Sequence, residues 1–175
     1  LTVTSNNVGG LVGVQYSGAP IIECYATGNI VSTGSYIGGL VGYQGGEVRN
    51  SFSTASVTGK SYVGGLIGTG CNNLINSYAI GKVTKTGNSG SIGGLRGDYN
   101  NAYTVTNSYW TPETTTQTDS CGDMDKKGEP NNIDSMSRVA GYTDWDFTDV
   151  WTVEAGTTIA YLKNVDKPNS VIIAN

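Results

Sequence analysis

Histidine is absent from the 175-residue chain, and cysteine is scarce, with three residues. Without histidine, Ser-His and Cys-His catalysis are excluded, and cysteine loses its usual partner in zinc sites. Cys24, Cys71 and Cys121 are also too few for a disulfide framework. A bridge between Cys71 and Cys121 remains open, whereas Cys24 is interpreted as a small buried residue.

Positive charge and long apolar runs are lacking as well. The chain has 10 Lys and Arg against 14 Asp and Glu, which gives a net charge of −4 and a pI near 4.6. Nucleic-acid binders need clustered cations, so we expect no nucleic-acid partner. No apolar run approaches the ~18 residues of a membrane helix, so we expect no membrane insertion. The sequence opens at Leu1 without an initiator Met or a signal peptide, and we expect it to be part of a longer protein.

Glycine, by contrast, is abundant. The 26 glycines, together with 4 prolines and 14% charged residues, suit many short strands joined by tight turns better than helices. The composition therefore predicts an all-β fold, with one domain or a repeat body plus a small cap.

A glycine-rich motif recurs four times at near-constant spacing. The copies are VGGLVG from Val8, IGGLVG from Ile37, VGGLIG from Val63 and IGGLRG from Ile92. A second block follows each copy. These blocks are IIECYATGNI from Ile21, VRNSFSTASV from Val48, LINSYAIGKV from Leu74 and VTNSYWTPET from Val105. Each block has a small residue, with an apolar residue three positions earlier and an aromatic residue one position later.

A single repeat is too short to bury its own apolar face, but stacked repeats share one continuous core. We therefore predict a parallel β-solenoid, also called a β-helix, of about four rungs over residues 1–111. Residues 112–137 are polar and are predicted to form a loop. Residues 138–175 contain Trp145, Phe147, Trp151 and Tyr161 in one short span. We predict that this segment is a C-terminal cap that hides the open end of the solenoid, with its tryptophans in the core.

Column parity predicts which residues face the solenoid interior. The Gly-Gly pair allows a bend that turns both Val8 and Leu11 inward, with their equivalents in the other copies. The next column begins at Val12 and ends at Arg96, and because a charge inside a solenoid is costly, we place this column outside, at least in the fourth rung. In the second block, the column of Ile30 and the small residues face inward, and the aromatic column faces outward.

The two blocks resemble the GLUG repeat family, through VGGLVG and the downstream NSYAIGKV from Asn76. The tail, NSYWTPETTTQTDSCGD and then GYTDWDFTDVWTV and YLKN, is similar to the segment that often follows such repeats in bacterial surface proteins. The resemblance implies a secreted or cell-wall-attached bacterial or archaeal protein, such as an adhesin, a hemagglutinin-like protein or an IgA-cleaving metallopeptidase. In these proteins the repeats lie outside the catalytic domain, so no catalytic residue carries over.

The acidic residues of the rungs do not form a catalytic pair in the sequence pattern. Glu23, Glu47 and Asp98 occupy columns that are not equivalent. A β-helical polysaccharide-cleaving enzyme would need two carboxylates brought together by folding. We therefore predict that this chain is not itself an enzyme and needs no cofactor, although the parent protein could be an enzyme.

One segment of the tail has calcium-loop spacing. Suitable residues stand at positions one, three, nine and twelve, with glycine at position six: Asp123, Asp125, Asn131, Asp134 and Gly128. Lys127 and Pro130 break the pattern, since they replace an oxygen ligand and an apolar residue. The segment is interpreted as a solvated acidic loop or, alternatively, as a Ca²⁺ site.

The aromatic column is the most suggestive binding feature of the sequence. It consists of Tyr25, Phe52, Tyr78 and Tyr109. Exposed rings in such a ladder could bind a glycan or the apolar surface of a partner protein, from a host or the environment. The alternative is stacking between rungs, or burial against another domain. The sequence thus favours an extracellular or cell-surface scaffold, structural or adhesive, that presents the neighbouring domains of its parent protein, with a carbohydrate-binding module as the alternative.

Overall fold

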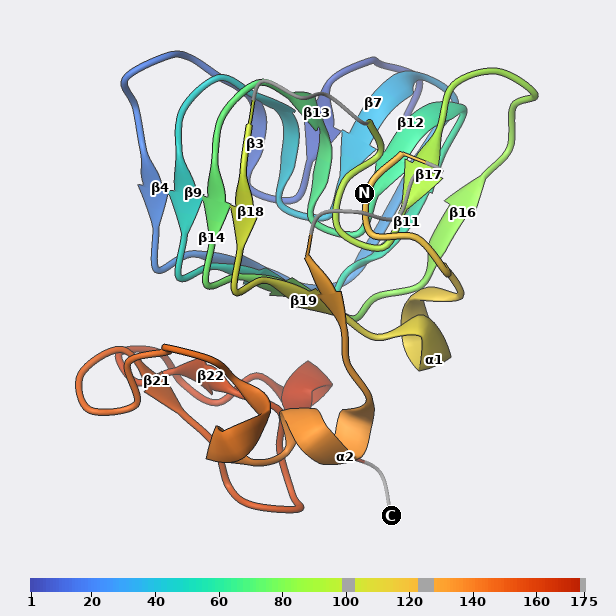
Figure 1. The fold of residues 1–175 in the computed structure, drawn as a ribbon. Helices are drawn as coiled ribbons and strands as arrows, with labels where there is room; N and C mark the ends of the chain where they lie inside the picture. The colour runs from blue at the N-terminus through green and yellow to red at the C-terminus, as the bar shows by residue number, and fades with distance from the viewer. Residues whose placement is uncertain (99–102, 123–127, 174–175) are drawn as a thin grey trace.

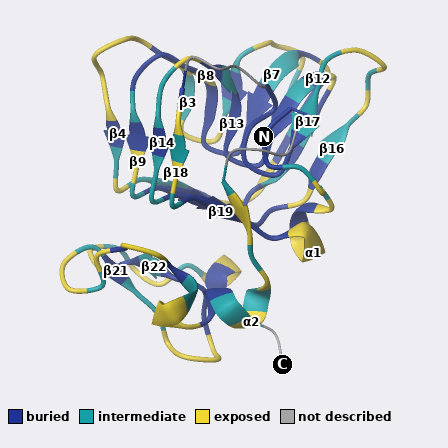
Figure 2. Cartoon of the chain, in the orientation of Figure 1, coloured by how far each residue is buried: buried dark blue, intermediate teal, exposed yellow. Residues whose placement is uncertain are grey.

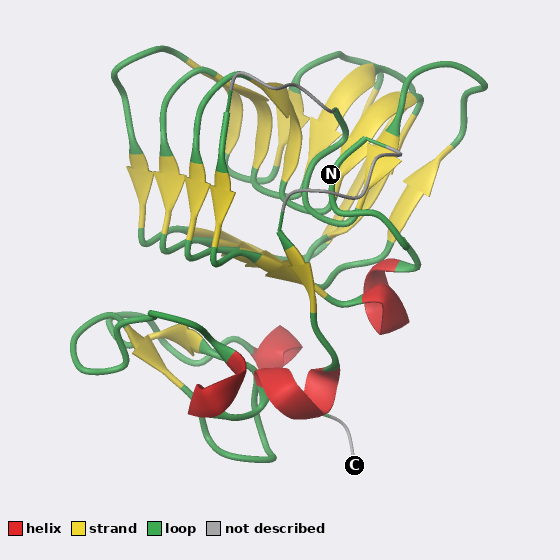
Figure 3. Ribbon diagram, in the orientation of Figure 1, coloured by secondary structure: helices red, strands yellow, loops and turns green. Residues whose placement is uncertain are grey.

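The computed structural model of the protein describes residues 1–98, 103–122 and 128–173. The repeat region winds into stacked rungs, and each strand pairs in parallel with the same strand of the next rung (Figures 1 and 3). Five sheets therefore run along the stack. The predicted all-β solenoid of about four rungs is confirmed.

The strands of these five sheets are two to four residues long. The first sheet contains β1 (Thr2–Val3), β6 (Asn29–Ser32), β11 (Ser56–Gly59) and β16 (Val83–Lys85). The second contains β2 (Val8–Gly9), β7 (Ser35–Gly38), β12 (Ser61–Gly64) and β17 (Ile92–Gly93). The third contains β3 (Val12–Gln15), β8 (Val41–Gln44) and β13 (Ile67–Gly70). The other two are β4 (Ile21–Ile22), β9 (Val48–Arg49), β14 (Leu74–Ile75) and β18 (Val105–Thr106); and β5 (Tyr25–Ala26), β10 (Phe52–Ser53), β15 (Tyr78–Ala79), β19 (Tyr109–Trp110) and β20 (Glu129–Pro130).

The remaining elements belong to the C-terminal third of the chain. They are α1 (Pro112–Thr115), α2 (Ile133–Met136), η1 (Val139–Gly141), β21 (Trp151–Thr152), β22 (Tyr161–Leu162) and η2 (Asn169–Val171). Strands β21 and β22 pair antiparallel. Figure 1 shows that the segment after β20 forms a separate layer below the solenoid. Among the described residues, no helix has the length and apolar character needed to cross a bilayer.

The Gly-Gly corners let the rungs approach closely. A Cβ at Gly39 would overlap the carbonyl oxygen of Gly65 and the side chain of Ser53. Because this corner tolerates no side chain, the following leucine column packs inside, where Leu40, Leu66 and Leu95 are fully buried. The inward prediction is confirmed in these three rungs. Leu11 in the first rung is instead 48% exposed, because no earlier rung covers it.

The column after these leucines was predicted to face outward, and that prediction is wrong. Val41, Ile67 and Arg96 are fully buried. Strand β8 begins at Val41, directly after the corner at Leu40, so these consecutive residues lie on two sides of one rung. Parity does not carry across a corner, and both side chains therefore face the interior.

A hydroxyl ladder connects the rungs at the Cys/Ser column. The backbone N–H of Cys24 donates to Oγ of Ser51, that of Ser51 to Ser77, and that of Ser77 to Ser108, each at 3.1 Å. The serine hydroxyls in turn donate to the carbonyl two residues earlier. The Ser columns are buried as predicted, whereas Cys24 at the end of the ladder is only half-buried.

The C-terminal end of the stack is partly covered by Trp110 and by residues that were predicted to form a loop. Trp110 takes the place of Ala26, Ser53 and Ala79 in its column and fills the interior, with its indole N–H donating to Gln117. The carbonyl of Ser120 accepts the N–H groups of Leu95 and Arg96, and β20 pairs with β19. The predicted loop thus contributes a partial fifth layer, while the predicted cap covers a side of the solenoid.

The position before the Cys/Ser column has a left-handed backbone in every rung. Its φ is 52° at Glu23, 48° at Asn50, 46° at Asn76 and 45° at Asn107. Asparagine tolerates this region better than other non-glycine residues, so Glu23 is the least suited of the four.

We therefore expect Glu23→Asn to raise the free energy of unfolding by about 0.5–1 kcal/mol, because it relieves backbone strain at an exposed position. Urea denaturation would measure the change, with Glu23→Ala as a control that keeps the strain. An unchanged or lower stability in Glu23→Asn would contradict this account.

Candidate functional site

The predicted aromatic ladder exists, and its rings stack face to face. Tyr25 and Phe52 lie 5.0 Å apart between centroids at an interplanar angle of 10°. Phe52 and Tyr78 lie 4.9 Å apart at 8°. Tyr109 continues the column in register with Tyr78. The rings point away from the solenoid interior, as the sequence predicted, because they alternate with the buried column of Ala26.

The C-terminal module, residues 131–173, covers this ladder. Trp151 lies 6.1 Å from Phe52 and 6.2 Å from Tyr78, and Trp145 lies 5.9 Å from Tyr109. Phe52 and Tyr78 are fully buried, and Tyr109 is 3% exposed. Figure 2 shows mostly buried strands along the side of the solenoid that lies toward the C-terminal module. Of the two predicted alternatives, stacking between rungs with burial against another part of the chain therefore holds for these three rings, and only Tyr25 stays half-buried.

Hydrogen bonds fix the module in place over the ladder. The Tyr78 hydroxyl donates to the carbonyl of Ala160 at 2.7 Å, and the Trp145 indole N–H donates to the carbonyl of Asn107 at 2.8 Å. The Tyr109 hydroxyl accepts the N–H of Thr143 at 2.9 Å. The tryptophans are core residues, as predicted. The aromatic column thus serves as the docking face for the chain's own C-terminal module.

Burial raises the pKa of two tyrosines at the contact between the aromatic column and the C-terminal module. Desolvation raises the pKa of Tyr78 well above its ordinary value, and the charge of a deprotonated Tyr142 adds to the effect. Desolvation also raises the pKa of Tyr142, against the opposing effect of a hydrogen bond from the Ala160 N–H. Both groups are therefore neutral hydrogen-bonding residues at physiological pH.

The structure also contains a buried ionic cluster that the sequence did not predict. Arg96 is fully buried, and its Nη2 lies 3.2 Å from Oδ1 of Asp98. Its Nη1 donates to Oε1 of Gln44, and its guanidinium carbon lies 3.7 Å from the ring centroid of Tyr103. Asp98 also accepts from the Thr69 hydroxyl at 2.9 Å and from the Gly70 N–H at 3.1 Å. The cluster compensates the charge that was expected to keep Arg96 outside.

This cluster occupies the last rung, where Trp110 and residues 119–122 close the stack. Asp98 follows Arg96 by two residues, so the sequence did contain an indication of this ion pair. Gln44 lies two rungs earlier in the chain, and no spacing rule connects it to Arg96. Arg96 and Asp98 neutralise each other and both make further hydrogen bonds, as expected for charges with a structural role.

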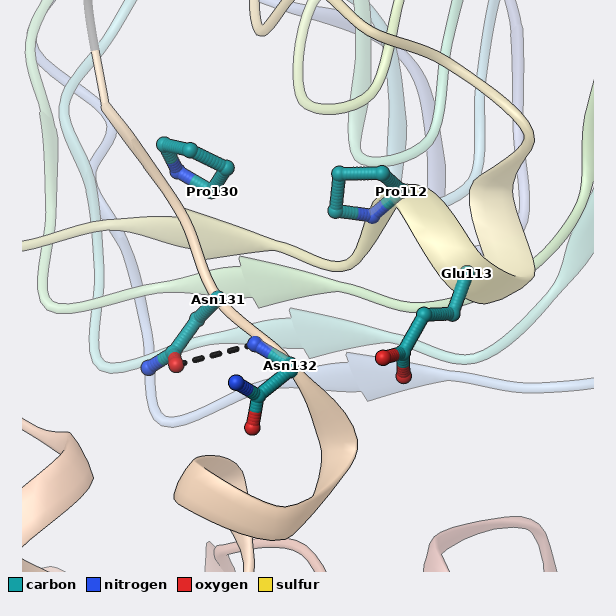
Figure 4. Close-up of a pocket in the computed structure, with 5 residues that line it drawn as sticks. All are labelled: Pro112, Glu113, Pro130, Asn131 and Asn132. Carbon is teal, nitrogen blue, oxygen red and sulfur yellow. Dashed lines mark hydrogen bonds between the residues drawn. The ribbon is translucent and has the colours of Figure 1, made fainter.

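A shallow pocket lies where the end of the solenoid meets the C-terminal module (Figure 4). Its volume is about 270 Å³, and it is lined by Pro112, Glu113, Pro130, Asn131 and Asn132. The Glu113 carboxylate accepts the N–H of Ile133 at 3.2 Å, and Asn132 caps α2 by accepting from Ser135 at 2.7 Å. The polar side chains of this pocket therefore already hold α2 against α1.

The predicted calcium ligands fall partly outside the described residues, which do not include Asp123 and Asp125. Asn131 donates to the carbonyl of Gly141 at 2.9 Å, and Asp134 lies 3.1 Å from Arg138. Gly128 has φ +91°, and a Cβ there would crowd Leu95 and Ser108. The glycine therefore has a packing role over the end of the stack, and the Ca²⁺ site stays a prediction.

The other acidic candidates differ in their side-chain partners. Glu47 pairs with Arg49 at 3.8 Å, Asp98 pairs with Arg96, and Glu23 stands at its strained corner. Cys71 is exposed, Cys121 is buried at the C-terminal end of the stack, and no disulfide joins them.

The fold and its docking face define a β-solenoid repeat protein with a module packed on one side. The family model of the GLUG motif matches residues 4–31 and 33–58. The first two rungs therefore match the GLUG motif, and the predicted resemblance to the GLUG repeat family is confirmed. Comparisons with curated proteins and with solved structures gave no match.

The buried ion pair gives a stability prediction. Asp98→Ala should lower the free energy of unfolding by about 3–5 kcal/mol, because it leaves the Arg96 charge buried without its partner. Denaturant unfolding would measure this loss. Glu47→Ala removes the exposed Arg49 pair and should change stability by less than about 1 kcal/mol. Equal effects of the two variants would contradict the role of the cluster.

The raised tyrosine pKa values give a pH prediction. Unfolded tyrosine loses its proton near pH ~10, whereas Tyr78 and Tyr142 keep theirs when folded. The unfolded state then binds fewer protons, so stability is intact below pH ~10 and falls above it, by about 1.4 kcal/mol per pH unit and tyrosine. In Tyr78→Phe the loss of stability above pH ~10 should be smaller by the contribution of one tyrosine, about 1.4 kcal/mol per pH unit. Urea titrations between pH 8 and 11.5 would test it, and identical slopes would refute it.

Proposed function

We propose that this chain is a non-catalytic repeat module of a larger secreted or cell-surface prokaryotic protein, in which it extends and presents neighbouring domains. The observation that carries the proposal is the in-register stack, in which each column continues from rung to rung. Each rung adds about 4.8 Å along the axis, so the number of repeats sets the length of the module. The surface context comes from the GLUG resemblance and is part of the proposal.

The way the chain uses its large side chains supports a scaffold. Three of the four rings in the aromatic column are covered by the C-terminal module, and the most buried charges neutralise each other in the Arg96 cluster. These groups stiffen the module, because the two clusters connect segments far apart in the chain. Stiffness is the property that a presenting module needs.

A carbohydrate-binding role is the second candidate, and the stacked aromatic column favours it. Rings in this spacing could pack against sugar faces. In the folded chain, however, the module covers all but Tyr25. Glycan binding through the full ladder would therefore require the C-terminal module to dissociate from the aromatic column.

The scaffold proposal predicts that the module tolerates added length in whole rungs. Inserting a second copy of residues 37–62 after Tyr62 should leave the unfolding temperature within a few degrees and lengthen the particle by about 4.8 Å in small-angle scattering. Inserting only residues 37–49 should destroy the register and destabilise the fold. Loss of folding on whole-rung insertion would contradict the proposal.

Binding and activity assays separate the candidates. On a glycan array the intact chain should show no saturable binding, and binding that is lost in Tyr25→Ala would favour the carbohydrate module instead. Release of new reducing or unsaturated ends from acidic polysaccharides would favour a β-helical enzyme.

An antibody against the repeats should label intact cells or culture medium of the source organism, and exclusively intracellular labelling would contradict the surface location.

A further inference from the structure

A second pair of stacked rings lies outside the contact with the C-terminal module. Tyr36 in β7 and Tyr62 in β12 lie 5.2 Å apart between ring centroids, at an interplanar angle of 19°, and both are half-buried. Figure 1 shows β7 and β12 away from the layer that the C-terminal module forms below the solenoid. The equivalent positions in the first and fourth rungs are Asn7 and Ser91. The repeat itself therefore does not require this aromatic pair.

Both tyrosines have a left-handed backbone. The angle φ is 66° at Tyr36 and 52° at Tyr62. A bulky residue in this region is a conformational outlier, whereas asparagine tolerates it, and Asn7 has the same conformation in the first rung with φ 52°. Backbone strain of this kind is concentrated at ligand-binding and active sites, where the side chain is retained for what it contacts. The strain at these two positions thus indicates a role for the rings beyond folding.

The third rung has a longer connection beside Tyr62. Residues 84–91 connect the equivalent positions of β16 and β17, whereas residues 58–62 connect those of β11 and β12 in the rung before. The longer connection passes the ring, since a Cβ at Gly90 would lie 3.1 Å from Cε2 of Tyr62. Insertions within single repeats lie on one face of a repeat protein, and this is often the binding face. The insertion and the strained rings therefore mark the same surface.

Small polar residues surround the two rings. Residues 86–91 read TGNSGS, and Ser35 and Ser61 directly precede the tyrosines. Tyr, Ser, Gly and Asn are the residues that antibody loops use to bind proteins, because tyrosine offers rigid contact area and the small residues offer adaptable hydrogen bonds. The composition of this surface therefore favours a protein partner.

The charged groups of this surface are positive. Lys60 is exposed at the turn between β11 and β12, and Lys85 pairs in register with Gly59. The Lys85 Nζ donates to the carbonyl of Gly90 at 2.6 Å. No ion pair of the described residues involves either lysine, and the sequence has no Asp or Glu in residues 48–97. Because interfaces are electrostatically complementary, the matching partner is acidic.

We propose that residues 35–36, 60–62 and 85–91 form a binding surface for an acidic segment of a partner protein. Tyr36 and Tyr62 supply rigid contact area, and the two lysines pair with carboxylates of the partner. The scaffold role does not depend on this surface, because the module can present its neighbouring domains whether or not the surface is occupied.

An NMR titration of the whole ¹⁵N-labelled chain tests this proposal. The probe is a synthetic peptide in which Glu alternates with Gly, compared with the same peptide carrying Gln in place of Glu. We expect saturable shifts of backbone amides that cluster in the proposed surface, with at least about tenfold weaker binding of the Gln peptide. Added salt should weaken binding of the Glu peptide, because it screens exposed charges.

Substitutions separate the rings from the charge. Tyr62→Asn and Lys60→Glu should each weaken binding at least about tenfold. Tyr62→Asn should change the unfolding temperature little, because asparagine fits the left-handed backbone better than tyrosine. Tyr16→Asn and Lys163→Glu are the matched controls, since they make the same replacements at exposed positions outside the proposed surface, and they should leave binding unchanged. If Tyr62→Asn unfolds, Lys60→Glu decides, because it leaves the ring pair intact.

Absence of saturable shifts, shifts centred on another part of the chain, or equal binding of the Glu and Gln peptides would overturn the proposal. Unchanged binding in Tyr62→Asn and Lys60→Glu would do the same, and a loss of stability in Tyr62→Asn with unchanged binding would make the ring pair a purely structural stack. Tighter binding of polygalacturonate than of the Glu peptide at these residues would assign the surface to acidic sugars instead of a protein.

Discussion

Parallel pairing between identical strands of successive rungs is the constraint on which the rest of the structure depends. The strands are only two to four residues long, and none could persist alone. Stacking gives every strand a partner of the same sequence type, so apolar, small, hydroxyl and aromatic residues each form continuous columns. The Gly-Gly corners permit this stacking because they leave room for the backbone of the adjacent rung.

A stack built in this way has two problems: its interior is open at the ends, and its aromatic column lies on an outer side. The fourth rung solves the first by departing from the repeat: Trp110 fills the interior, and Arg96 exchanges an apolar column position for a neutralised ion pair. The C-terminal module solves the second by covering the aromatic column. The proposed scaffold role rests on the same architecture, because its columns continue from rung to rung.

The fold could be predicted well from the sequence, and the candidate site only in part. Four copies of one motif define a solenoid, and the outward direction of Phe52 and Tyr78 follows from alternation within one strand. The exposure of those rings could not be predicted, because it depends on Trp145 and Trp151, which are some 70 to 100 residues away in the chain. The column of Val41 was misplaced because the charge of Arg96 was expected to be too costly to bury, whereas Asp98 and Gln44 compensate it inside the stack.

The sequence by itself determined the repeat, its columns and the small-residue corners, since these depend on local spacing and on contacts between equivalent positions. Only the tertiary structure decided which surface the C-terminal module covers and how a buried arginine is compensated. These outcomes depend on single, non-repeating contacts such as Arg96 with Gln44 and Tyr78 with Ala160. No periodicity encodes such contacts, because each occurs once and joins residues far apart in the chain.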